Sequence, residues 1–461
     1  MSDMRFDRAM SDAEGLMWRL EKDPHLSSII GTVWILDRAP DFDAFRRRLE
    51  QATIAVPRLR QRVAPQPANI SRPVWVDDPD FDLDLHVRRI ACPKPGSLRQ
   101  VLDICSVLLA DPFERTRPLW QFVLIEGMRG GKAAVLQKMH HTITDGERGV
   151  ELSLQYLDFE RDAPEPPPLA DPIETFGAGG HAPSSSAVRE FVAGGIRMPL
   201  GLARQVRELL TDPASIPAAS SAAVKTVKGV VTQLSDTDAA RSPLWTQRSL
   251  HRRIEVLRVP FRETKDASKR LGGTLNTAFI TAAAQAAGDY HRRIGVPVEH
   301  LRTTMAISTR TESSGGNAFS LARLLVPTGP MPIAERFQLI LEAVATAQAV
   351  SKEAGGLDTL AAFAATLPTS LITRLARQQS QTIDFATSNV KASPVPCYIA
   401  GAQILEMYPV GPLAGVAFNM TLISYLGSLD IGVNIDTAAV PQPDLLITCL
   451  NTAFKDLAAA R

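Results

Sequence analysis

Short apolar runs separated by turn residues mark the first third of the chain. Residues 29–36 form one such run, Leu119–Glu126 a second and Ala133–Leu136 a third. The last two flank the glycine turn Arg129–Gly131, so they predict a β-hairpin. Residues 29–36 predict a further strand.

Three other segments have clear periodicity. Phe42–Ile54 repeats apolar residues with helical spacing and predicts an amphipathic helix, and Ser97–Ala110 predicts a second helix. Phe81–Val87 alternates apolar and polar residues, which predicts a half-buried strand.

The second half of the chain alternates strand-like and helix-like patterns, which indicates an α/β fold. The predicted strands are Arg253–Val259, Thr303–Ser308, Ile383–Val390, Gln403–Tyr408, Asn419–Tyr425 and Leu429–Ile435. The predicted helices are Phe261–Leu271, Thr274–Arg292, Pro332–Ala354 and Leu357–Arg377.

A stretch rich in Pro, Gly and Ser, Asp158–Ser186, has the composition of a linker. We therefore expect an N-terminal domain over residues 1–160, a linker over 161–241 and a C-terminal domain over 242–461. Within the linker, Val188–Leu210 interleaves apolar residues with arginines. It predicts an amphipathic helix that either lies on an anionic membrane surface or packs between the domains.

Composition excludes some classes of protein. The 461 residues are 45% hydrophobic and 21% charged with a net charge of +1, so a dedicated nucleic-acid binder is not indicated. The four cysteines have neither zinc-site nor disulfide-framework spacing, which favours a reducing cytoplasm. No apolar run approaches the ~20 residues that span a bilayer, so we expect a soluble or peripherally bound protein.

The stretch with the clearest chemistry is HHTITDG, residues 140–146, which begins where a predicted strand ends. A neutral imidazole is a natural general base near neutral pH, so His141 can take a proton from a hydroxyl or amine. Asp145 can orient the loop, and Gly146 suits a tight bend after it.

Three plainer interpretations remain open. The histidines can be satisfied polar groups at a strand end. They can bind a metal together with Asp145, although adjacent histidines on an extended backbone point to opposite faces. Asp145 can also cap a helix over residues 147–156.

HHxxxDG resembles the motif of the CoA-dependent acyltransferase superfamily, which includes chloramphenicol acetyltransferase and peptide-synthetase condensation domains. Further stretches narrow the resemblance to the bacterial wax ester synthase/diacylglycerol acyltransferase family. They are Met10–Glu14, Pro57–Arg60, Asp111–Trp120, Leu124–Gly127, Gly316–Ser320, Ser388–Val390 and Gly401–Pro412. The resemblance implies a two-domain, chloramphenicol acetyltransferase-like α/β fold. Each domain is then a mixed sheet with helices, and the active-site channel lies at their interface.

The resemblance also implies roles for the motif residues. His141 is the general base, His140 supports it, Asp145 is mainly structural and Gly146 sets the loop geometry. Loss of His140 is expected to reduce activity less than loss of His141.

Outside the motif, the family has an Asn-Asp pair in its second half. Asn276 matches the asparagine and gives either polar support to the reaction or an anchor for a helix start, whereas Thr277 stands in place of the aspartate. Pro118, Leu119 and Trp120 either shape the acyl channel or pack in the core.

The implied activity is transfer of a fatty acyl group from acyl-CoA to a lipophilic alcohol. Diacylglycerol would give triacylglycerol, and a fatty alcohol would give a wax ester. Acyl-CoA is the co-substrate, and no metal or other cofactor is expected. Contact with the inner membrane face or lipid inclusions is a further expectation. The alternatives are a weakly active or non-catalytic acyl-lipid-binding paralogue and a condensation-type, amide-forming enzyme.

Overall fold

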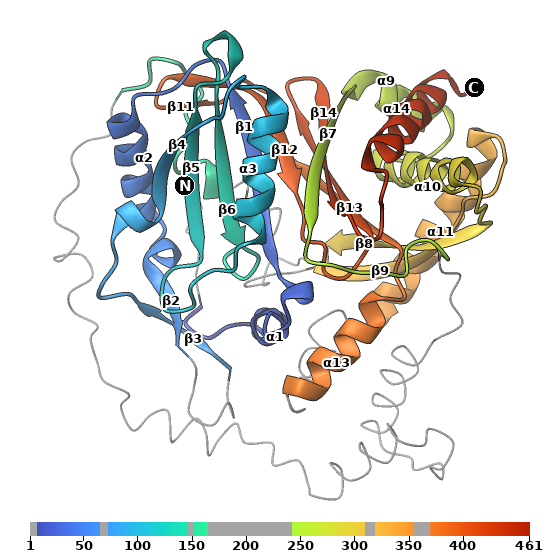
Figure 1. Ribbon diagram of the computed structural model, residues 1–461, viewed down its shortest axis with the longest axis horizontal. Helices are drawn as coiled ribbons and strands as arrows, with labels where there is room; N and C mark the ends of the chain where they lie inside the picture. The colour runs from blue at the N-terminus through green and yellow to red at the C-terminus, as the bar shows by residue number, and fades with distance from the viewer. Residues whose placement is uncertain are drawn as a thin grey trace, which may run out of the picture. The chain divides into compact units, whose positions relative to one another are not determined.

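The computed structural model describes residues 7–64, 72–144, 149, 152–164, 242–308, 319–353 and 369–461. All of them belong to one unit of the chain. Two six-stranded mixed sheets organise this unit (Figure 1). The predicted linker falls largely outside the described residues, including the helix expected over 188–210, so the domain boundaries stay predictions.

The first sheet has the order β11-β12-β1-β6-β5-β4. Only the β4–β5 pair is parallel. Its strands are β1 (Ile29–Leu36), β4 (Val87–Ala91), β5 (Trp120–Glu126), β6 (Ala133–His140), β11 (Tyr398–Ile399) and β12 (Ala402–Val410). Its helices are α1 (Asp12–Leu20), α2 (Phe42–Ala55) and α3 (Leu98–Ala110), and β2 (Gln61–Ala64) pairs with β3 (Val74–Asp77) beside it.

The second sheet has the order β7-β14-β13-β10-β8-β9, with β10 parallel to both of its neighbours. Its strands are β7 (Arg252–Pro260), β8 (His300–Ser308), β9 (Phe319–Pro327), β10 (Phe385–Lys391), β13 (Phe418–Tyr425) and β14 (Ser428–Asp436). Its helices are α9 (Phe261–Arg270), α10 (Leu275–Ile294), α11 (Ile333–Glu353), α13 (Thr369–Ser380) and α14 (Pro443–Ala459).

The local predictions agree well with these elements. The hairpin is confirmed, because β5 and β6 pair antiparallel around Arg129–Gly131. Both helices predicted before residue 111 are confirmed within one residue. The strand predicted at Phe81–Val87 is wrong, since Asp82 accepts the backbone N–H of Asp84 and closes a short 3₁₀ turn there. Such a local side-chain hydrogen bond competes with strand pairing.

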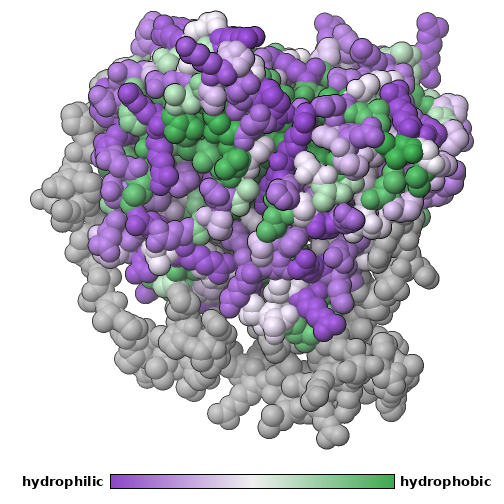
Figure 2. Space-filling model, viewed as in Figure 1, coloured by the Kyte–Doolittle hydropathy of each residue, from purple (hydrophilic) through white to green (hydrophobic). Residues whose placement is uncertain are grey.

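Hydrophobic residues gather in separate cores. The alanines of α10 pack against α14 and the second sheet, and α3 covers one face of the first sheet. Figure 2 shows further hydrophobic residues on the surface over β4, β5 and α3; Ile90, Ile104 and Leu108 are partly exposed there. No helix among the described residues is long and apolar enough to cross a membrane.

The chain passes from β10 of the second sheet to β11 and β12 of the first, and then returns to β13 of the second. β12 comes from the last quarter of the chain, yet it pairs with β1 near the N-terminus (Figure 1). On the second sheet, the buried carboxylate of Asp430 accepts the backbone N–H of Met407 at 2.8 Å and pairs with Arg258 at 3.1 Å. The predicted C-terminal segment therefore completes the sheet of the N-terminal segment.

Gly432 on β14 lies very close to the backbone of β12. A Cβ atom added there would overlap the carbonyl oxygen of Pro409 on β12. We expect Gly432→Ala to lower the free energy of unfolding by about 1–3 kcal/mol, since backbone must move to make room. Urea unfolding measures this. Gly15→Ala is the control, because Cβ would meet only an ordinary contact at 3.7 Å there. Equal free energies of unfolding for Gly432→Ala and Gly15→Ala would contradict the close contact between β14 and β12.

Candidate active site

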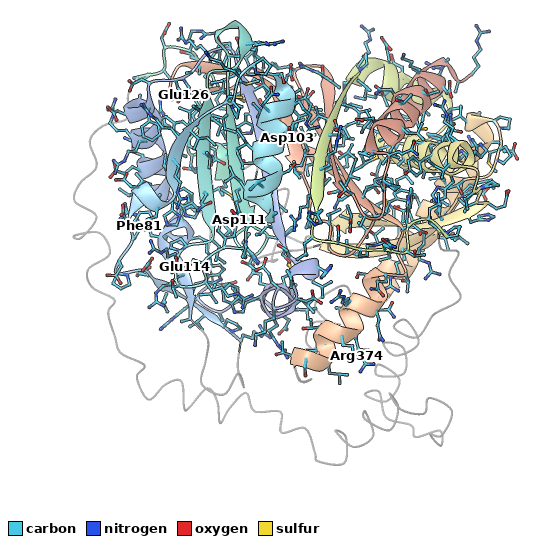
Figure 3. All side chains as sticks on the ribbon, viewed as in Figure 1. Phe81, Asp103, Asp111, Glu114, Glu126 and Arg374 are labelled. Atoms are coloured by element: carbon cyan, nitrogen blue, oxygen red, sulfur yellow. The ribbon has the colours of Figure 1, made fainter. Side chains whose placement is uncertain are left out.

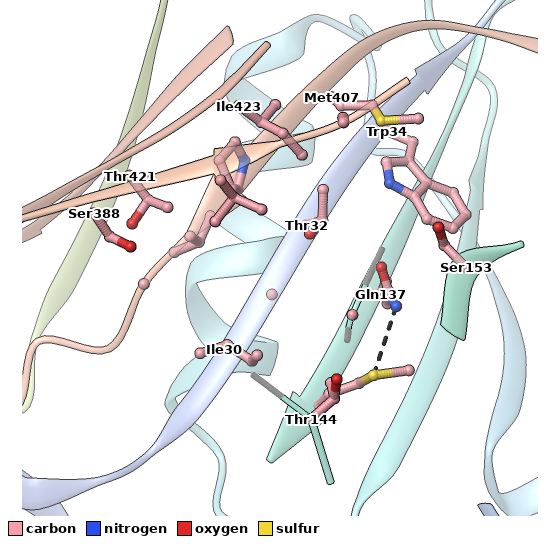
Figure 4. Close-up of a pocket in the computed structure, with 18 of the residues that line it drawn as sticks. Ile30, Thr32, Trp34, Gln137, Thr144, Ser153, Ser388, Met407, Thr421 and Ile423 are labelled. Carbon is pink, nitrogen blue, oxygen red and sulfur yellow. Dashed lines mark hydrogen bonds between the residues drawn. The ribbon is translucent and has the colours of Figure 1, made fainter. Parts of the chain in front are cut away.

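A cavity of about 320 Å³ lies between the two sheets. From the first sheet, Thr32, Gln137 and Met407 line it; from the second, Ser388 and Thr421 do so (Figure 4). Most of the lining residues are apolar, with a few polar groups among them. This combination suits a ligand with a hydrocarbon part and one reacting polar group.

His141 lines this cavity from the end of β6. Alternation along the strand places Gln137, Met139 and His141 on the cavity face, and all three line it. The backbone N–H of His141 donates to the carbonyl oxygen of Ser28 at 3.0 Å, which continues the β1–β6 ladder by one residue. The imidazole is therefore carried by a paired strand end.

His140 points to the other side and is fully buried. Its Nε2 lies 2.7 Å from Oε2 of Glu21, and its Nδ1 accepts the backbone N–H of Thr142 at 3.2 Å. The Thr142 hydroxyl is also 2.7 Å from Nδ1. The backbone N–H of Thr142 favours a lone pair on Nδ1, and the ring proton then lies on Nε2, where it is donated to Glu21.

Glu21 is a buried carboxylate with several donors around it. Burial raises the pKa of Glu21, but the hydrogen bonds from His140 and from the backbone of Ser28, together with the positive charge of Arg115, outweigh burial, so the pKa is lowered overall. Ser27 and the backbone N–H of Ser28 also donate to it, at 3.1 and 3.3 Å. Glu21 is therefore ionised beside the histidine pair at neutral pH.

A family model described as the wax ester synthase/diacylglycerol acyltransferase catalytic domain matches residues 10–279. The model of the corresponding C-terminal domain matches residues 315–458. The chain belongs to the wax ester synthase/diacylglycerol acyltransferase family. The predicted family and the predicted enzyme class, an acyltransferase, are thus confirmed.

Individual relatives agree with this assignment. A putative diacylglycerol O-acyltransferase of Mycobacterium tuberculosis is 34% identical over 99% of this chain and 92% of its own length. A second protein of that organism, a probable diacylglycerol O-acyltransferase, is 27% identical over 96% of this chain and 94% of its own.

Solved structures confirm the predicted two-domain α/β fold. A wax ester synthase/diacylglycerol acyltransferase from Marinobacter aquaeolei VT8 matches with a TM-score of 0.68 and 22% identity, covering 97% of this chain and 98% of its own. The first condensation domain of the calcium-dependent antibiotic synthetase matches with a TM-score of 0.60 and 15% identity, covering 99% and 97%.

Two of the residues with roles implied by the family motif, Asp145 and Gly146, lie outside the described residues. The next three, Pro118, Leu119 and Trp120, do not line the cavity that contains His141. They precede or begin β5, whereas the cavity is lined by β1, β6 and β12 of this sheet.

The structure places Leu119 and Trp120 in the hydrophobic core instead. The indole N–H of Trp120 donates to the carbonyl oxygen of Leu59 at 2.7 Å, and its ring stacks on His86. Of the two roles considered for these residues, core packing is the one that this geometry favours.

Asn276 and Thr277 lie at the start of α10 and do not line the cavity either. The backbone N–H of Thr277 donates to the hydroxyl of Thr274, which caps the helix, and the Thr277 side chain is buried. The side-chain amide of Asn276 contacts Met305. The backbone of Thr277 thus takes part in the helix cap, whereas Asn276 contacts β8. Neither side chain lines the cavity of His141.

Sequence reasoning missed several residues of the site. Ser388 belongs to a stretch noted for its family resemblance, but nothing in the sequence placed it opposite His141. Glu21 belongs to none of the noted stretches and meets His140 across 119 positions of chain. No local pattern signals such a contact.

Within the parts of the chain that the structure describes, no group of three or more His, Cys, Asp or Glu side chains could hold a metal ion. His140 uses both ring nitrogens on Glu21 and Thr142. A metal site built on this histidine pair is therefore not supported by the geometry of His140.

Proposed function

We propose that this protein is an acyl-CoA-dependent O-acyltransferase that moves a fatty acyl group to a lipophilic alcohol, with diacylglycerol as the principal acceptor. The observation that carries the proposal is the position of His141 on a paired strand end, facing a largely apolar cavity between the two sheets. The family assignment and the names of the relatives support the choice of substrates.

His141 acts as the general base in this reaction. It takes the proton from the acceptor hydroxyl while that oxygen bonds to the thioester carbon, which gives a tetrahedral oxyanion. When the oxyanion collapses, the carbon–sulfur bond breaks and the CoA thiolate takes the proton back from His141. The products are an ester and free CoA, and no covalent acyl-enzyme is needed.

The apolar part of the cavity holds the acyl chain. Trp34, Met407 and Ile423 line it together with Met139 (Figure 4). Binding the chain there places the thioester near His141, and such positioning accounts for a large share of catalysis in two-substrate reactions.

The oxyanion needs a hydrogen-bond donor, and the second sheet offers hydroxyl groups. Ser388 and Thr421 are register partners on the parallel strands β10 and β13, and both line the cavity. Thr421 donates to Asn419, which in turn donates to the carbonyl oxygen of Pro412. Because the Thr421 hydrogen is used there, Ser388 is the better donor for the oxyanion.

We expect Ser388→Ala to lower kcat about 100-fold with little change in KM, because a donor to the developing oxyanion acts mainly in the transition state. Steady-state kinetics with palmitoyl-CoA measures both constants. Ser268→Ala is the matched control, since that hydroxyl donates to Lys265 on α9 and does not line the cavity. A Ser388→Ala enzyme with the kcat of this control would exclude Ser388 as the donor.

The acceptor is water-insoluble, so the protein meets it at a lipid surface. Leu154 lines the cavity and is 49% exposed, which means that the cavity reaches the surface at an apolar residue. Val395, which is 46% exposed, follows closely after the lining residue Ser393. An apolar rim of this kind favours entry of a lipid from a membrane face or a lipid inclusion. A cytoplasmic location and the absence of a cofactor remain predictions; acyl-CoA is a substrate.

A thiol-release assay tests the proposed function. Purified protein receives palmitoyl-CoA with dioleoylglycerol or, separately, with hexadecanol. We expect alcohol-dependent release of free CoA, faster with dioleoylglycerol. Folded protein that releases no CoA with either alcohol would leave a weakly active or lipid-binding paralogue as the better description.

A further inference from the structure

One carboxylate connects the end of β6, where the two histidines lie, with the residues that precede β1. Glu21 directly follows α1, and its side chain is 9% exposed. Oxygen Oε2 accepts from His140 of β6, and Oε1 accepts from Ser27 and Ser28, which precede β1. Three donors, one on β6 and two just before β1, thus converge on one largely buried anion.

On the opposite edge of the His140 ring, the backbone of Thr142 favours a lone pair on Nδ1. The backbone N–H of Thr142 points at Nδ1, so a proton on Nδ1 would face another donor. With Glu21 present, the proton is held on Nε2 by a charge-assisted hydrogen bond, which is a strong one. Glu21 therefore stabilises the Nε2–H tautomer of His140, in which Nδ1 can accept the backbone N–H of Thr142.

The hydrogen bonds of Glu21 and His140 hold the residues on either side of His141. His140 and Thr142 flank it in the chain and are linked through the His140 ring. Its own N–H is held by the carbonyl of Ser28, whose N–H is held by Glu21. The backbone of His141 is thus fixed on both sides, while its imidazole faces the cavity.

The surroundings keep Glu21 charged and in place. A guanidinium nitrogen of Arg115 lies 3.7 Å from Oε2, and the same side chain lies over the ring of Trp18. Trp18 also meets the His140 ring edge-on, with 6.3 Å between ring centroids. Neither Glu21 nor His140 lines the cavity, so both act through His141 and not on the substrate.

We infer that Glu21 is a positioning residue of the acyl-transfer site, which fixes the Nε2–H tautomer of His140 and thereby the placement of His141. The expected effect on kcat rests on the proposed function. The effect of Glu21 on the tautomer of His140 does not depend on it.

The test compares Glu21→Ala and Glu21→Gln with the unmodified protein by two readouts. In Glu21→Ala we expect kcat to fall about 100-fold while KM for palmitoyl-CoA changes little, because a misplaced base affects the reacting geometry. Glu21→Gln keeps one carbonyl oxygen for the His140 N–H, so we expect a smaller loss of kcat in this variant. Glu114→Gln is the control; Glu114 lies on the loop after α3, is mostly exposed and pairs with Arg117 (Figure 3).

The second readout is NMR of isotope-labelled histidine, with the His140 signals assigned from their loss in His140→Asn. We expect the unmodified protein to show the proton of His140 on Nε2, and Glu21→Ala to show it on Nδ1 or divided between the two nitrogens. Unchanged tautomers in both Glu21 variants, or kcat values within about two-fold of Glu114→Gln, would overturn the inference.

The two readouts separate the failure of this inference from that of the proposed function. If Glu21→Ala does not fold, Glu21→Gln decides by the same two measurements, with a smaller kcat loss and a partial loss of the Nε2–H form expected. If the unmodified protein transfers no acyl group, the proposed function fails, and the tautomer measurement still decides whether Glu21 sets the state of His140.

Discussion

Replacing His141 by alanine is expected to lower kcat about 10³-fold, since removing a general base costs between about 10² and 10⁴ in rate. The imidazole is the ionisable group that β6 presents to the cavity, and its removal leaves binding of acyl-CoA and alcohol to the rest of the lining. KM should therefore change much less than kcat. Free CoA released per minute, measured with dioleoylglycerol in excess, gives both constants.

His140→Ala is the informative comparison for this variant. His140 is buried and bonded to Glu21 and Thr142, so its removal disturbs the support of the base but leaves the base itself. We expect a smaller loss of kcat than in His141→Ala, with some loss of stability. A larger loss of kcat in His140→Ala than in His141→Ala, with both proteins folded, would reverse the assignment of the base.

Trp120→Ala is expected to lower the free energy of unfolding by about 3–5 kcal/mol, the cost of truncating a fully buried aromatic side chain. The residue has no exposed surface, stacks on His86 and donates to the Leu59 carbonyl. Urea unfolding monitored by circular dichroism measures the change. This effect on stability is the largest that we expect from any single residue discussed here.

Trp120→Phe separates packing from catalysis. It keeps an aromatic ring beside His86 but loses the hydrogen bond to Leu59, which costs about 1 kcal/mol. Because Trp120 does not line the cavity, the folded variant should retain kcat and its preference for acyl chain length. A changed chain-length preference with unchanged stability would show instead that Trp120 shapes the acyl channel.

The family assignment identifies the reaction, and the structure identifies the residues that face the substrate. The matches over residues 10–279 and 315–458 establish the family, and hence acyl transfer. The cavity identifies which of the two histidines can meet a substrate. The likeness to a condensation domain at 15% identity concerns the fold alone and does not favour amide formation.

Local patterns in the sequence predicted local structure well. The β5–β6 hairpin follows from apolar runs around Arg129–Gly131, because glycine at positive φ closes the turn. Gly427 was expected, together with Ser428, to form the turn between β13 and β14; the structure places the turn at Leu426 and Gly427, one residue earlier. The strand predicted at Phe81–Val87 from alternating residues was wrong, because the Asp82 side chain accepts the backbone N–H of Asp84 and stabilises a turn there.

The sequence by itself determined the elements around the histidines, the opposite directions of His140 and His141, and the family. These depend on residues close together in the chain or on an ordered set of motifs. Tertiary structure alone decided that β12 pairs with β1, that Ser388 lines the cavity with His141, that Trp120 packs in the core and that Glu21 meets His140. Each of these contacts joins distant parts of the chain, and burial and hydrogen-bond satisfaction across the whole fold select them, which no local periodicity encodes.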